Sequence, residues 1–172
     1  AQQKEEEIGS REFWMFIGSL VLMISVVQIT YTTSMPVWNK LFGTNLAITD
    51  PVTHYNKIQI WITSLILLGT SCIYYLKFKH TNMVDMLKKI SIPVLISAIL
   101  TIVICYTQKL SNGPIVVFMS LSVLSAVANL YYLATVIKTN IIKWGGTTAH
   151  LGFGLMMVGV ILSGYNKEVI SI

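Results

Sequence analysis

The sequence predicts an all-α protein, a polytopic bundle of five transmembrane helices. Its mean hydropathy is +0.69 and only 11% of its 172 residues are charged, whereas a typical soluble domain has about 25% charged residues. The apolar residues also stand in unbroken runs, such as Val-Leu-Met-Ile-Ser-Val-Val. A membrane-spanning strand would alternate apolar and polar residues instead. We therefore expect the chain to lie in a lipid bilayer as helices.

Five stretches are long enough to cross the membrane. A hydrocarbon core about 30 Å thick takes about 20 helical residues. We expect the spans near Phe13 to Thr33, Ile58 to Leu76, Ile90 to Tyr106, Pro114 to Ile137 and Gly145 to Gly164. A loop of 24 residues then separates the first two spans, and residues 1–172 form a single bundle.

The basic residues predict the orientation, because short loops rich in lysine and arginine stay in the cytoplasm. The loop between the second and third spans carries Lys77, Lys79, Lys88 and Lys89. With that loop inside, eight basic residues lie on the cytoplasmic side and four outside. We therefore expect a cytoplasmic N-terminus and an external C-terminus. The net charge of +5 fits an anionic lipid surface and requires no nucleic acid.

The two ends indicate a piece of a longer protein. The chain begins at Ala1 without an initiator methionine or a signal-peptide pattern. It ends in Val169-Ile170-Ser171-Ile172, an apolar alternation that we expect to begin a strand of an external domain.

Several classes of chemistry are disfavoured. None of the seven acidic residues lies within a predicted span, whereas an ion-driven transporter normally needs a buried carboxylate. The sequence also has no Cys-x-x-Cys zinc motif and no glycine-rich phosphate loop. Cys72 and Cys105 are expected near opposite faces of the membrane, too far apart for a disulfide.

One ionisable residue, His150, lies inside a predicted span, where such residues are costly and usually functional. Gly146 and Gly154 stand four residues before and after it, on the same stripe of the helix. Because glycine leaves bare backbone, we expect this stripe to accept a flat, metal-centred ring beside the imidazole. A hydrogen bond to a neighbouring helix is an equally good account of His150.

Three further polar residues are explained better by structural or surface roles than by binding a ligand. Asn129 is expected about 12 Å from the cytoplasmic boundary of the membrane. There it could orient the imidazole of His150, because a metal-bound histidine usually donates its other ring N–H to a hydrogen-bond acceptor. A bridge between two helices explains Asn129 better. His54 precedes the second span, and a helix-start or surface role explains it better than metal binding. His80, in the basic loop, is expected to be solvated.

Four segments together resemble a known family. They are Ser10-Arg11-Glu12 at the opening of the first span, Pro36 at its close, the segment around Asn56, and Gly145-Gly146 with Ala149-His150-Leu151-Gly152. In this order the chain resembles, over nearly its whole length, the CcmF-type haem lyases of cytochrome c maturation.

The resemblance implies that His150 is one of two transmembrane histidines that hold a haem b, the other lying outside this chain. It implies the bacterial inner membrane as the location. It implies apocytochrome c and other cytochrome c maturation membrane proteins as partners, with haem attached through thioether bonds at the outer face. The family's tryptophan-rich segment and external haem-binding histidines have no counterparts here, so this chain alone is not expected to catalyse the attachment. Arg11 and Glu12 are expected to form an ion pair that anchors the first helix.

Two other interpretations stay open. In the first, the protein is a non-catalytic bundle that scaffolds an assembly or forms part of a small-molecule export path, and His150 is a packing residue. In the second, it is a related haem-handling membrane protein that serves a different thioether system. A haem spectrum of the purified protein separates the first of these from the haem lyase hypothesis.

Overall fold

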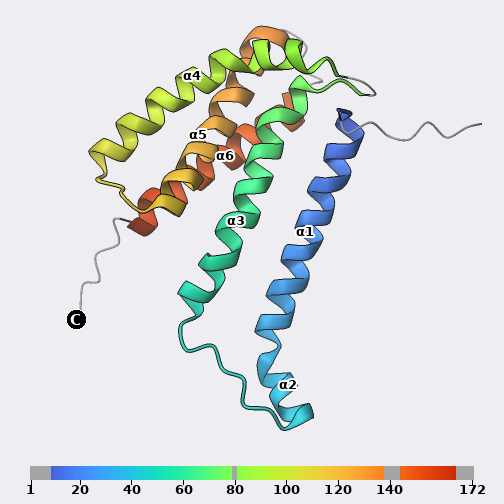
Figure 1. Ribbon diagram of the computed structural model, residues 1–172, viewed down its shortest axis with the longest axis vertical. Helices are drawn as coiled ribbons and strands as arrows, with labels where there is room; N and C mark the ends of the chain where they lie inside the picture. The colour runs from blue at the N-terminus through green and yellow to red at the C-terminus, as the bar shows by residue number, and fades with distance from the viewer. Residues whose placement is uncertain (1–8, 79–80, 138–143, 166–172) are drawn as a thin grey trace, which may run out of the picture.

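A computed structural model describes residues 9–78, 81–137 and 144–165 (Figure 1). These residues are mainly helical and contain no strand. Five of their helices are long and apolar enough to cross a membrane, as predicted: α1 (Arg11–Thr33), α3 (Pro51–Cys72), α4 (Met83–Thr107), α5 (Gly113–Tyr132) and α6 (Trp144–Tyr165). The predicted strand at 169–172, His80, and the basic residues Lys4, Lys79, Lys138, Lys143 and Lys167 lie outside the described residues.

Polar caps set the starts of three spanning helices. Ser10, Asp50 and Asn82 each precede a helix, and their side chains accept hydrogen bonds from backbone amides two or three residues later. Such caps satisfy amides that the first turn leaves unpaired. For this reason α3 and α4 begin well before Ile58 and Ile90, where the apolar runs alone placed the second and third spans.

The loop predicted between the first two spans contains a short helix, α2 (Met35–Phe42). Pro36 stands in its first turn, where a fixed φ and a missing N–H are tolerated. Gly43 ends the helix with a φ of 65°, in the left-handed region that glycine favours. Pro36, expected to close the first span, therefore lies in the first turn of a separate helix, and the loop predicted between the first two spans is helical over these residues.

Helix α5 lies at the centre of the bundle, against α3, α4 and α6. Its buried residues include the small side chains of Ser122, Ser125, Ala126 and Ala128, which allow neighbouring helices to approach closely. A 3-10 turn, η1 (Ile73–Tyr75), extends α3, and a π-helical turn, η2 (Leu133–Ile137), extends α5. Figure 1 shows α4 on one side of α5 and α3 on the other.

Helix α1 stands at the edge of the bundle beside α3 (Figure 1). No residue in its most apolar stretch is buried. Hydrogen bonds hold α1 near its two ends. The amide of Arg11 donates to the carbonyl of Lys77 at 3.0 Å, and in the other half of the helix the side chain of Gln59 bonds to Gln28 at 2.7 Å and to Ser25 at 2.9 Å.

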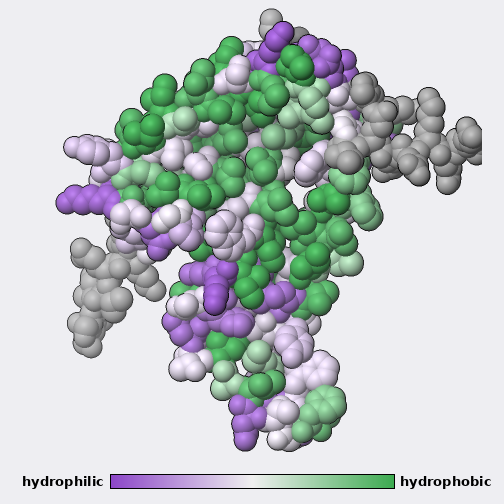
Figure 2. Space-filling view, viewed as in Figure 1, coloured by the Kyte–Doolittle hydropathy of each residue, from purple (hydrophilic) through white to green (hydrophobic). Residues whose placement is uncertain are grey.

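The outer surface of the helices is apolar. Figure 2 shows green side chains along the helices, with purple groups gathered near the loops. Phe16 and Met23 on α1 and Ile99 and Ile102 on α4 are each more than half exposed. An apolar surface this extensive marks contact with lipid or a partner rather than water. The described helices thus belong to a multi-pass membrane protein, while the orientation of its termini stays a prediction.

Candidate functional site

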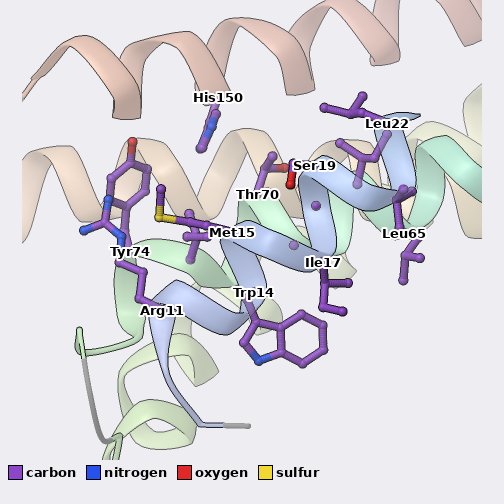
Figure 3. A pocket seen from close by; sticks show the side chains of 15 residues that line it. Arg11, Trp14, Met15, Ile17, Ser19, Leu22, Leu65, Thr70, Tyr74 and His150 are labelled. Atoms are coloured by element: carbon purple, nitrogen blue, oxygen red, sulfur yellow. The ribbon is translucent and has the colours of Figure 1, made fainter. Parts of the chain in front are cut away.

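A cavity of about 420 Å³ lies between α1, α3 and the first half of α6 (Figure 3). Its volume is within the range of about 300 to 1,000 Å³ that is typical of small-molecule and cofactor sites. The wall is mainly apolar, with a few polar groups that include Ser19 and Thr70. The cavity extends along α1 from Arg11, at the start of the helix, to Leu22, halfway along it. The bundle therefore has a cofactor-sized space within the membrane layer.

His150 forms part of this wall. Its ring projects from α6 toward the space beside α1 (Figure 3). The side chain is half-buried, and its Nδ1 atom is buried without a hydrogen-bond partner among the described residues. A buried nitrogen that makes no hydrogen bond costs free energy. The prediction that His150 stands inside a span is confirmed, and its imidazole borders the cavity while its Nδ1 atom is covered by protein atoms.

Tyr74 lies between His150 and Arg11. The ring centres of Tyr74 and His150 are 5.4 Å apart, with 49° between their planes. The guanidinium carbon of Arg11 lies 5.1 Å from the centre of the Tyr74 ring, within the range of cation–π attraction. Tyr74 also stacks on Tyr132 of α5. Four helical segments therefore converge at Tyr74, which the sequence did not mark as a site residue.

Protein atoms fill the space beside both glycines of the predicted stripe. A Cβ at Gly146 would collide with the hydroxyl of Tyr74. A Cβ at Gly154 would lie 2.7 Å from the amide nitrogen of Ala126 and 3.0 Å from the carbonyl oxygen of Ser122. The expectation that this stripe accepts a flat ring is therefore wrong. Helical spacing identified the face of α6 but not the element that covers it, and at Gly154 that element is α5.

Two other glycines border the cavity. Gly18 of α1 and Gly69 of α3 both belong to its wall. A Cβ at either position would meet no atom within 4 Å apart from its own local backbone. The free space beside His150 thus lies toward α1 and α3. The sequence did not single out these glycines, because no ionisable residue stands near them in the chain.

Asn129 bridges two helices. Its amide nitrogen donates to the carbonyl of Ser125 at 2.8 Å and to the carbonyl of Thr70 on α3 at 3.2 Å, and the residue is buried. The ordinary account of Asn129 is confirmed. Among the described residues no hydrogen bond joins Asn129 to the imidazole of His150, so Asn129 does not orient it.

Arg11 supplies a positive charge at one end of the cavity. Its Nε atom is buried and makes no hydrogen bond to any described residue. The predicted ion pair with Glu12 does not form, because adjacent residues of a helix point in different directions. Within the described ranges, no carboxylate lies close enough to neutralise the guanidinium.

The remaining candidates lie away from the cavity. His54 is in the first turn of α3, where its amide donates to the carbonyl of Asp50 and its ring contacts Tyr55 edge-on. This location agrees with the helix-start account. Cys72 and Cys105 are free thiols. No group of three or more histidine, cysteine, aspartate or glutamate residues in the described ranges could hold a metal ion by itself.

Comparison with known proteins does not identify a relative. No family model, curated protein or solved structure matches the chain. The similarity to CcmF-type haem lyases therefore rests on the sequence segments alone.

Proposed function

We propose that this chain is a haem-binding part of the cytochrome c maturation machinery of the bacterial inner membrane, with His150 as one axial ligand of a haem b. The half-buried imidazole of His150 on the wall of a cofactor-sized cavity carries the proposal. The second axial ligand belongs to a segment or protein outside this chain. Apocytochrome c and other maturation proteins of the membrane are the partners in this proposal.

The imidazole of His150, as a ligand of the iron, and the apolar wall of the cavity both fit a haem. Histidine nitrogen is a common axial ligand of haem iron. The flat faces of a porphyrin require apolar surroundings, which Leu22, Leu65 and Ile66 provide. The open space beside Gly18 and Gly69 would receive the ring, in place of the stripe around Gly154.

A bound haem b supplies one-electron transfer at a potential set by its axial ligands and its burial. The residues of this chain hold and shield it. One nitrogen of His150 would bind the iron, and the other would be left for a hydrogen-bond partner. The apolar residues of α1 and α3 exclude water. Formation of the thioether bonds belongs to the outer face and to parts of the machinery beyond this chain.

The proposal is tested by His150→Ala in the protein expressed from its whole gene and purified from membranes. We expect the wild type to give a reduced-minus-oxidised spectrum of a b-type haem, and the variant to lose most of that signal. His54→Ala is the matched control, because His54 lies outside the cavity, and it should keep the haem content of the wild type.

A second variant separates loss of the ligand from loss of the fold. His150→Gly leaves space at the ligand position, so added imidazole should restore part of the haem signal. A colourless wild type, or an unchanged haem content in both His150 variants, would contradict the proposal. Either result would favour the scaffold or export-path interpretation.

A further inference from the structure

We infer that Arg11 binds a carboxylate of the molecule that occupies the cavity, and thereby fixes the direction in which this molecule lies. The inference rests on the proposed function, under which the carboxylate is a propionate of the haem. It adds a second binding residue, which would contact the edge of the ligand, whereas His150 would bind the iron at its centre.

The first argument is one of charge. Arg11 borders the cavity, and in the described part of the protein no carboxylate pairs with it and no acceptor reaches its buried Nε. A guanidinium is always charged and offers donors in a planar fork that matches a carboxylate. Partial burial beside a lipid layer raises the cost of leaving such a group unpaired. An anionic group on the ligand would offset that cost.

The second argument is one of distance. The centre of the Tyr74 ring is 5.1 Å from the guanidinium carbon of Arg11 and 5.4 Å from the centre of the His150 ring. The guanidinium and the imidazole are therefore at most about 10.5 Å apart. Even this upper limit does not exceed the size of a porphyrin with its propionate side chains. A single haem can thus reach both residues.

The third argument is one of preorganisation. The Tyr74 ring holds the guanidinium by cation–π attraction and is itself stacked on Tyr132. The start of α1 is fixed by the Ser10 cap and by the bond from the Arg11 amide to Lys77. Arg11 is therefore held at the cavity before any ligand binds. Arg11 would thus hold an anionic group of the ligand at its own end of the cavity, away from Leu22.

The experiment compares haem with haem dimethyl ester, in which both propionates are blocked. Apoprotein from the whole gene is titrated with each compound, and affinity is read from the absorbance of the bound form. We expect the wild type to prefer haem by about tenfold or more, because hydrogen bonds between charged groups are among the strongest in proteins. Arg11→Gln should lose most of this preference, and Arg11→Lys should retain part of it. Lys89→Gln, an exposed cation near the same boundary, is the matched control and should leave the preference unchanged.

The outcomes separate this inference from the proposed function. If Arg11→Gln keeps the preference of the wild type while His150→Ala abolishes binding of both compounds, Arg11 does not bind the propionate and the haem proposal stands. If neither compound binds the wild type, the proposed function fails. A phosphate of an anionic lipid has similar chemistry. If a lipid phosphate is the partner of Arg11, transfer from phosphatidylcholine to phosphatidylglycerol vesicles raises the thermal stability of the wild type but not that of Arg11→Gln. In that case Arg11→Gln leaves the preference for haem over its dimethyl ester unaffected.

Discussion

A larger side chain at Gly18 or Gly69 would fill part of the cavity with little disturbance of the backbone. Both border the cavity, and both have open space where a side chain would begin. We expect Gly18→Leu and Gly69→Leu to lower the haem content at least tenfold, because the added side chains occupy the volume of the ring. Haem per protein, measured by absorbance, and the Tm of the apoprotein give the two readouts.

Gly159→Leu is the control for these two variants. Gly159 also has open space beside it, but it does not belong to the cavity wall. It should keep both the haem content and the Tm of the wild type. Normal haem binding in Gly18→Leu and Gly69→Leu would place the haem elsewhere.

The sequence predicted some residues of the site and missed others for a physical reason. His150 could be found because an ionisable group in an apolar run is rare. Arg11 was noticed but was assigned to an ion pair with Glu12, which the structure does not contain. Tyr74 and Gly18 carry no such signal, since their importance depends on which helices lie beside α6. The sequence pattern shows which residues share one face of a helix but not which other helix packs against that face.

The contact between α5 and α6 depends on Gly154, whose missing side chain lets the two backbones meet at Ala126 and Ser122. We expect Gly154→Ala to lower the free energy of unfolding by about 1 to 3 kcal/mol, because the added methyl group has no space and the helices must separate. Unfolding in mixed micelles, followed by circular dichroism, measures the change. Gly159→Ala, on the outer side of the same helix, should change the stability by less than about 0.5 kcal/mol. Equal effects of the two substitutions would mean that α5 does not pack at Gly154.

The five spanning helices could be predicted because lipid leaves the backbone few alternatives. Each unpaired amide is costly in hydrocarbon, so a long apolar run must be helical. The ends of the helices were harder, because α3 and α4 begin at the polar caps Asp50 and Asn82, outside the apolar runs. Helix α2 was missed because Pro36 in its first turn and Gly43 just after its end are both residue types common in loops.

The starts of α1, α4 and α6 lie at one end of the bundle, together with the ends of α3 and α5 (Figure 1). The excess of lysine and arginine predicts that this side is cytoplasmic. In a cysteine-free background, we expect a membrane-impermeant maleimide applied from outside to label Lys109→Cys but not Lys88→Cys. Both variants should react once the membrane is permeabilised, which controls for the reactivity of each position. Labelling of Lys88→Cys alone in intact cells would reverse the orientation.

The position of α1 has a mechanical consequence. Helix α6 meets α5 backbone to backbone, whereas α1 packs mainly against α3, is hydrogen-bonded at Gln59 and Lys77, and has no buried residue in its most apolar stretch. Under a force that pulls the two termini apart, α1 therefore detaches at a lower load than α6. Because α1 forms one wall of the cavity, its detachment would empty the cavity while α3 to α6 were still folded.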